Sequence, residues 1–120
     1  MASHNELGKL GEALAVEFLL SKGYTIVARN FIFDKSEIDI IAQKEKDTLV
    51  IVEVKTRNSI AFGNPQEFVT PKKIKHLVKA ANEYVIQHEL NLEAQFDIIA
   101  VLKNKKEERI EHFENAFYHF

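Results

Sequence analysis

The sequence of 120 residues contains no cysteine, and glycine and proline are scarce, with four and two residues. Without cysteine there is no disulfide framework, no cysteine-ligated zinc site and no thiol catalysis, and the composition fits a reducing compartment. The chain has no internal repeat, no low-complexity segment and no stretch that reads as a linker. A single domain over residues 1–120 is therefore predicted.

Long apolar runs and an excess of one charge are also missing. Purely apolar runs such as Leu49–Val52 are far shorter than the roughly 20 residues that cross a bilayer. The first six residues contain an acid and no cationic stretch, unlike a secretory signal, so a cytoplasmic protein with no membrane contact is expected. Sixteen Lys and Arg face eighteen Asp and Glu, which excludes a protein that coats nucleic acid by bulk charge. Any anionic partner must meet a local basic patch.

Two helices are predicted from apolar residues at helical spacing. Ser3 followed by Glu6 is a reciprocal capping pattern, and the first helix should run to about Ser21, where Gly23 suits the C-cap. Thr70-Pro71 fits an N-cap followed by proline at the first helical position, and predicts a second helix that ends near residues 87–90. A chain of this length and composition can pack both helices on one core without disulfides or metals.

Five segments rich in β-branched and aromatic residues predict strands separated by polar turns. They cover residues 24–33, 37–42, 49–55, 96–102 and 109–113. The element order is αβββαβ with a further short strand, which indicates an α/β fold with a mixed β-sheet flanked by helices.

Two predicted strands carry an acid where a buried strand should be apolar. These acids are Asp39 and Glu53, and Glu53 shares one face of its strand with Lys55 because side chains alternate. A buried carboxylate must be paired, protonated, exposed at the end of the sheet or bound to a cation. A divalent metal would satisfy both acids, and an ion pair of Lys55 with either acid is the structural alternative.

Magnesium suits two carboxylates, because it prefers hard oxygen ligands and keeps positions for water and substrate phosphate. The backbone carbonyl of Val54 would complete the ligand set. Lys55 would then hold the attacking water or neutralise charge that develops on the phosphoryl oxygens. The reaction predicted in this way is hydrolysis of a phosphodiester.

An ordered set of short motifs spans nearly the whole chain and resembles a known family. The motifs are Gly8, Gly11-Glu12, Ala15, Gly23-Tyr24, Arg29-Asn30, Glu37-Ile38-Asp39-Ile40-Ile41, Val52-Glu53-Val54-Lys55-Thr56-Arg57, Phe62-Gly63, Lys72, Phe96-Asp97 and Asn115-Ala116-Phe117. The set is similar to the UPF0102, or YraN-like, family of small bacterial proteins. Asp39 followed by Glu53-Val54-Lys55 also resembles the active-site signature of the PD-(D/E)XK nuclease superfamily. Ser36 and Gln95 depart from the family pattern, where a glycine and an arginine are usual.

That resemblance implies a restriction-endonuclease-like core, similar to that of archaeal Holliday-junction resolvases, in an endonuclease that depends on Mg²⁺ or Mn²⁺. It implies Asp39 and Glu53 as metal ligands, Lys55 as the catalytic lysine and Glu12 as an additional acid. Periodicity alone does not choose between Glu12 and Glu17. The implied substrate is structured or branched DNA in repair or recombination, and a homodimer would suit an enzyme that nicks a junction twice.

Basic residues that could bind nucleic acid lie on the second helix. Lys72, Lys75 and Lys79 fall at i, i+3 and i+7, and the N-terminus of the helix adds partial positive charge. Such lysines are more often a solvated amphipathic face. The track could continue through Arg57, Lys73 and the loop at Phe62-Gly63. Two other functions therefore stay open: an accessory protein that binds nucleic acid without cleaving it, and a structural interaction domain whose acids form ordinary ion pairs.

Overall fold

The structure, a computed structural model, describes residues 4–58 and 69–117. The described residues form two helices and a five-stranded sheet, and the predicted α/β class and element order are confirmed. The elements are α1 (His4–Ser21), β1 (Thr25–Phe33), β2 (Ser36–Lys44), β3 (Thr48–Arg57), α2 (Pro71–Gln87), β4 (Glu93–Lys103) and β5 (Glu108–Phe113). The predicted loop between β3 and α2 falls mostly on residues 59–68, outside the described ranges, as does Ser3 of the predicted cap.

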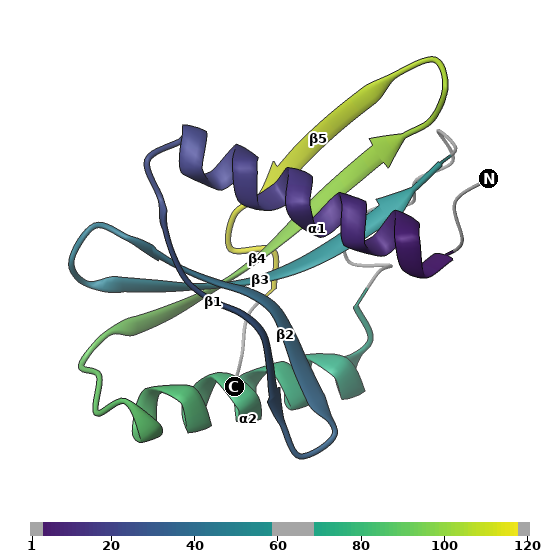
Figure 1. The fold of residues 1–120 in the computed structure, drawn as a ribbon. Helices are drawn as coiled ribbons and strands as arrows, with labels where there is room; N and C mark the ends of the chain where they lie inside the picture. The colour runs from purple at the N-terminus through teal and green to yellow at the C-terminus, as the bar shows by residue number, and fades with distance from the viewer. Residues whose placement is uncertain (1–3, 59–68, 118–120) are drawn as a thin grey trace.

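The sheet is mixed, as expected, with the strand order β1-β2-β3-β4-β5. Three neighbouring pairs are antiparallel, and β3 pairs in parallel with β4. A parallel pair needs a crossover connection, and α2 provides it by returning along the face of the sheet opposite α1 (Figure 1). The sheet is consequently covered by α1 on one face and by α2 on the other. Neither helix in the described ranges has the length and apolarity to span a bilayer.

Alternation along β3 divides the core into two layers. Val50, Val52 and Val54 pack with Ala15 and Leu19 of α1. The residues of the other parity pack against α2, and this second layer includes Leu49, Ile51, Leu77, Ala80 and Tyr84. Glu53 and Lys55 continue the parity of Leu49 and Ile51, so their side chains lie on the face that α2 covers.

The helix caps follow from local chemistry. Gly23 adopts a φ of 91° directly after α1, and the N–H of Tyr24 donates to the Leu19 carbonyl at 3.0 Å, as in a Schellman motif. At the start of α2 the Thr70 hydroxyl accepts a hydrogen bond from the N–H of Lys73 at 3.1 Å. Both helix ends were predicted from these residues, because capping depends on contacts within a few positions of the chain.

The closest approach between α1 and the sheet depends on a glycine. Gly11 is buried against Thr56 near the end of β3, and a Cβ atom at this position would overlap the Thr56 side chain. Gly8, one turn earlier, has open space where its Cβ would stand. The lack of a side chain at Gly11 therefore allows α1 to lie beside the end of β3. Glu12, the next residue of the helix, is consequently placed near this end of the strand.

Replacing Gly11 by alanine is expected to lower the free energy of unfolding by about 1–3 kcal/mol, because the added methyl group overpacks the contact with Thr56. The measurement is denaturant unfolding of Gly11→Ala beside Gly8→Ala. The Gly8 variant is the matched control, and it should gain up to about 1 kcal/mol from helix propensity alone. Equal stabilisation by both substitutions would contradict the close approach.

Candidate active site

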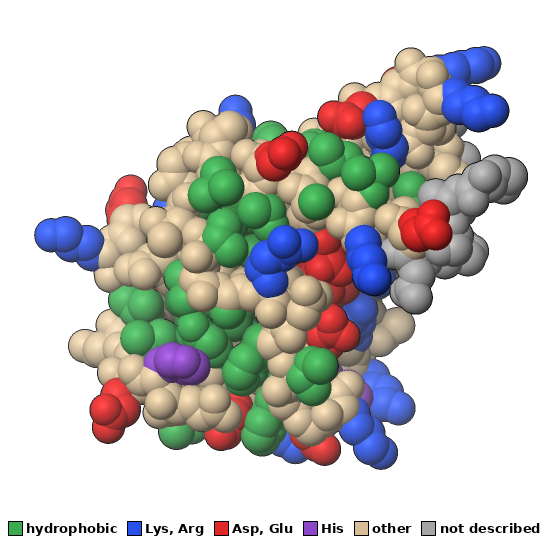
Figure 2. All heavy atoms as spheres, in the orientation of Figure 1, with side chains coloured by type: hydrophobic (Ala, Val, Ile, Leu, Met, Phe, Trp, Pro, Cys, Tyr) green, Lys and Arg blue, Asp and Glu red, His purple; other side chains and the backbone are tan. Residues whose placement is uncertain are grey.

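A cleft of about 250 Å³ lies where α1, β2 and the end of β3 meet. We call it the acidic cleft. It is lined by Leu7, Gly8, Glu12, Asp39, Glu53, Val54, Lys55, Thr56 and Arg57. Residues from three separate elements, predicted to act together, are thus brought to one place. Acidic and basic side chains gather near the middle of the face shown in Figure 2, below α1.

The two acids lie directly beyond the end of the β2–β3 ladder. The ladder ends with the pair Ile40 and Val52, and Asp39 and Glu53 are the next residues of the two strands. Here a side chain replaces the backbone partner, because the Val54 N–H donates to Asp39 Oδ2 at 2.8 Å. The carboxyl groups of Asp39 and Glu53 line the same cleft and interact with each other.

Glu53 is the most buried charged side chain of the cleft, with 4% of its area exposed. Its Oε1 atom lies 2.9 Å from Lys73 Nζ and 3.9 Å from Lys55 Nζ. The other oxygen, Oε2, is buried and has no hydrogen-bond partner among the described residues. A buried acceptor without a partner costs free energy, so this atom marks a position that a ligand would stabilise.

Burial and the neighbouring charges shift the pKa values of the acids and lysines in the cleft. Burial raises the pKa of Asp39 to about 8, and the negative charge of Glu53 adds to this effect, while the hydrogen bond from Val54 opposes it. Burial lowers the pKa of Lys55, and the nearby positive charge of Lys73 lowers it further. The pKa of Lys73 is raised, because its contact with Glu53 outweighs the effect of burial. A side-chain hydrogen bond between Asp39 and Glu53 also favours the protonated form of Asp39. Glu53 Oε2 is therefore without a partner when both acids are ionised, as they are when they hold a cation.

Glu12 is held at the cleft by an asparagine. Asn30 Nδ2 donates to Glu12 Oε1 at 2.9 Å and to Glu37 Oε1 at 3.1 Å, which ties α1 to β2. Asn30 has a φ of 53°, a conformation that asparagine tolerates better than most residues. Glu12 lines the cleft, whereas Glu17 is exposed.

The predicted basic track is only partly continuous. Lys72, Lys75 and Lys79 are all exposed on α2, but Lys79 Nζ lies 3.5 Å from Asp34 and sits over the Phe33 ring. Arg57 lines the acidic cleft, and its Nη1 donates to the Thr56 carbonyl at 2.9 Å. Phe62-Gly63 lies outside the described residues.

Two contacts of the site were missed from the sequence. Lys73 was considered only as part of a basic track, yet it is the nearest cation to Glu53. Its position in the first turn of α2 is visible in the sequence, but the direction in which that turn faces is not. Asn30 was noted only within a motif. Its role as a hydrogen-bond donor to two acids depends on the position at which α1 packs against the sheet.

The structure shows how Ser36 and Gln95, which depart from the family pattern, fit into the fold. Ser36 begins β2, and the turn before it is made by Asp34 at a φ of 57°. Gln95 Nε2 donates to Asp97 Oδ1 at 2.9 Å. Asp97 is fully buried and also accepts from His112 and from the N–H of Asn115, so this cluster fastens the last described segment to β4.

The carboxylates fit magnesium better than a metal that needs many protein ligands. Among the described residues no group of three or more His, Cys, Asp or Glu side chains is arranged to hold a metal ion. Magnesium is commonly bound by one or two carboxylates, with the other positions left to water and phosphate. Asp39 and Glu53, with the unpartnered Oε2 atom of Glu53, match that requirement.

Comparison with known proteins places the chain in a family. The profile of the Uncharacterised protein family UPF0102 matches residues 11–101. The chain belongs to the UPF0102 family. It is 68% identical over 120 residues to a UPF0102 protein of Flavobacterium psychrophilum, and 56% identical over 120 residues to one of Christiangramia forsetii, with all of both chains covered in each case. A UPF0102 protein of Flavobacterium johnsoniae is 53% identical over 124 residues, again with both chains covered completely.

The raised pKa of Asp39 in this UPF0102 protein predicts a pH-dependent stability. The ordinary pKa is 3.8 and the folded value is about 8, so between them the folded state holds a proton that the unfolded state has released. The stabilising contribution is complete below the ordinary pKa and is lost as the pH rises through about 8. Thermodynamic linkage limits the resulting slope to about 1.4 kcal/mol per pH unit.

Asp39→Asn is expected to remove that slope, because asparagine does not ionise and keeps an oxygen that can accept from Val54. Chemical unfolding of wild type and Asp39→Asn between about pH 5 and pH 8, without divalent cations, measures it. The variant should become more stable than wild type as the pH rises. Parallel pH profiles for the two proteins would show that the carboxyl is not held protonated by its surroundings.

Proposed function

We propose that this protein is a divalent-metal-dependent endonuclease that hydrolyses phosphodiester bonds of structured or branched DNA. The observation that carries the proposal is the unpartnered Oε2 atom of buried Glu53, in the same cleft as Asp39 and Lys55. Two carboxylates and a lysine in an open cleft have the composition that metal-dependent phosphodiester hydrolysis requires. The resemblance of the motif to PD-(D/E)XK nucleases supports the same reaction.

Asp39 and Glu53 would hold Mg²⁺ or Mn²⁺, with the Val54 carbonyl as a further ligand. When bound, the cation polarises the phosphate and lowers the pKa of a water molecule that attacks it. The protein's part is to supply two oxygen ligands in fixed positions. The strand register and the hydrogen bond from Val54 to Asp39 supply that rigidity.

Lys55 would orient the attacking water and stabilise the charge that develops on the phosphoryl oxygens. Its ammonium group lies 3.9 Å from Glu53 Oε1 and is partly exposed to the cleft. The lowered pKa of Lys55, caused first by burial, makes its proton easier to give up during the reaction. Glu12, held by Asn30, would accept a hydrogen bond from water in the cleft.

Arg57 would bind a phosphate that flanks the scissile bond, because it lines the cleft at the end of β3. A guanidinium group can contact two phosphate oxygens at once. A substrate with a branch point presents more than one strand to such a surface, and cutting a junction on two strands calls for two active sites. We therefore include a homodimer on DNA in the proposal.

The proposal predicts that cleavage depends on both acids and on Lys55. Glu53→Gln, Asp39→Asn and Lys55→Met are each expected to lower the rate of cleavage by about 100-fold or more, as is common when a group that stabilises the transition state is removed. The measurement uses four-way junction, forked and single-stranded DNA with Mg²⁺ or Mn²⁺. Asp47→Asn, in the exposed turn between β2 and β3, is the matched control and should cleave like wild type.

Cleavage that is equal in all four variants would reject the assignment, and cleavage by none of the proteins would favour the accessory function. The contact of Lys73 with Glu53 at 2.9 Å gives that second function a physical basis, since an internal cation already compensates one oxygen. A non-cleaving protein should still bind DNA with an affinity that falls linearly in log salt.

Metal binding should depend on pH, because a cation competes with the proton on Asp39. The pKa of Asp39 is about 8, so below that value the apparent affinity for Mn²⁺ should rise about tenfold per pH unit. Calorimetric titration at about pH 6 and pH 7 tests this, with proton release measured in two buffers of different ionisation enthalpy. An affinity that does not change with pH would place the ion away from Asp39.

A further inference from the structure

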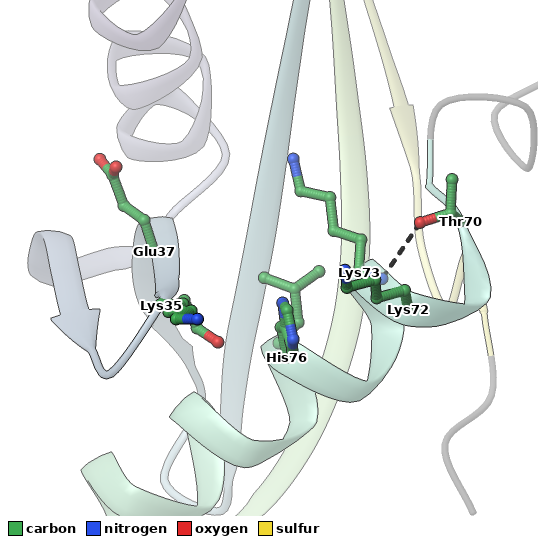
Figure 3. A pocket seen from close by; sticks show the side chains of 8 residues that line it. Lys35, Glu37, Thr70, Lys72, Lys73 and His76 are labelled. Atoms are coloured by element: carbon green, nitrogen blue, oxygen red, sulfur yellow. Dashed lines mark hydrogen bonds between the residues drawn. The ribbon is translucent and has the colours of Figure 1, made fainter.

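A second cavity, of about 270 Å³, lies between the β1–β2 turn and the first turns of α2 (Figure 3). We call it the basic cavity. It is lined by Lys35, Ser36, Glu37, Thr70, Lys72, Lys73, His76 and Leu77. Of these residues, Lys72 belongs to the predicted basic track and Lys73 to its predicted extension. Lys35 comes from the turn between β1 and β2 and lines the same cavity as Lys72 of α2.

Positive charge in the basic cavity exceeds negative charge. Figure 3 shows Glu37 extending toward α1, and its carboxylate accepts the hydrogen bond from Asn30. The ammonium group of Lys73 is engaged with Glu53. Among the described residues Lys35 and Lys72 form no ion pair. Two cations without an ion-pair partner, in a hollow whose one lining acid is hydrogen-bonded to Asn30, attract an anion.

Other groups in the wall of the basic cavity also suit an anionic ligand. Ser36 is only 5% exposed and contributes its side chain to the cavity. Thr70 and Lys72 belong to the N-terminal end of α2, where the helix carries partial positive charge. His76, one turn further along α2, completes this side of the cavity. Hydroxyl groups, ammonium groups and a helix N-terminus are the groups that bind phosphate oxygens.

The basic cavity adjoins the acidic cleft through one residue. The stem of Lys73 lines the cavity, and its Nζ atom lies 2.9 Å from Glu53 Oε1 in the cleft. Figure 3 shows this side chain reaching away from Lys72 along the strands. A phosphate in the basic cavity and a phosphate at the acidic cleft would therefore lie on either side of the same lysine.

We propose that the basic cavity binds a phosphate group of the nucleic-acid strand whose scissile phosphate occupies the acidic cleft. The assignment of that strand as substrate rests on the proposed function, whereas the affinity for phosphate does not. The group is either a terminal phosphate or an internal one of the backbone, since both present the same oxygens. The cavity would thereby determine how far the cleaved bond lies from a second phosphate.

Binding is measured by fluorescence anisotropy in EDTA, so that the outcome is independent of cleavage. The probes are three short single-stranded DNA oligonucleotides of one sequence, with a 5′-phosphate, a 3′-phosphate or no terminal phosphate. Lys35→Met and Lys72→Met are each expected to weaken binding about fivefold and to reduce the salt slope by about 0.7, the value for one phosphate contact on a single strand. Lys46→Met, an exposed lysine of the β2–β3 turn outside both cavities, is the matched control and should bind like wild type.

The three probes separate the two sources of phosphate. A terminal phosphate is the ligand if one phosphorylated probe binds more tightly and both lysine variants remove that gain. An internal phosphate is the ligand if all probes bind equally and both variants weaken all of them. Binding that neither Lys35→Met nor Lys72→Met changes would overturn the proposal. It would also be overturned if Lys72→Met and Lys75→Met weakened binding equally and Lys35→Met had no effect, because DNA would then bind along the exposed lysines of α2 and not in the cavity. Failure of cleavage with intact phosphate binding would refute the nuclease alone.

Discussion

The burial of the Glu53 carboxylate is the constraint on which the arrangement of this protein depends. One oxygen contacts Lys73 closely and Lys55 more distantly, and the other has no hydrogen-bond partner among the described residues. Its negative charge helps to hold Asp39 in the protonated form. A core built only for stability would place an apolar residue at this position, because a partly compensated buried charge is expensive. The incomplete compensation is the physical basis of the proposed cation site.

The surroundings of the Glu53 carboxylate depend on the point at which β2 separates from β3. Their backbone ladder runs up to Ile40 and Val52, and the next N–H, that of Val54, turns to the Asp39 side chain. Figure 1 shows the β1–β2 hairpin bending away from β3 toward α2. The bend brings the β1–β2 turn beside the start of α2, where the basic cavity forms. One divergence of strands thus places an acidic cleft and a basic cavity next to each other.

Local features of the chain could be predicted because their causes are local. Capping by Thr70 and Gly23 involves residues within one turn, and alternation along β3 assigns Glu53 and Lys55 to one face. Asp39 and Glu53 could be identified as candidate site residues because a carboxylate on an otherwise apolar strand must be paired, protonated, exposed or bound to a cation. The structure brings both of them into one cleft, as a shared site requires. Their roles as metal ligands stay a prediction.

The amino-acid sequence by itself determined the elements, the parity of each strand and the residue types that a phosphodiester site would need. Only the tertiary structure decided that Lys73 contacts Glu53, that Lys79 pairs with Asp34, and that Lys35 and Lys72 line one cavity. The reason is that periodicity fixes the direction of a side chain relative to its own helix or strand. The partner that it meets depends on the rotation of that element against others, and contacts distant in the chain set this rotation.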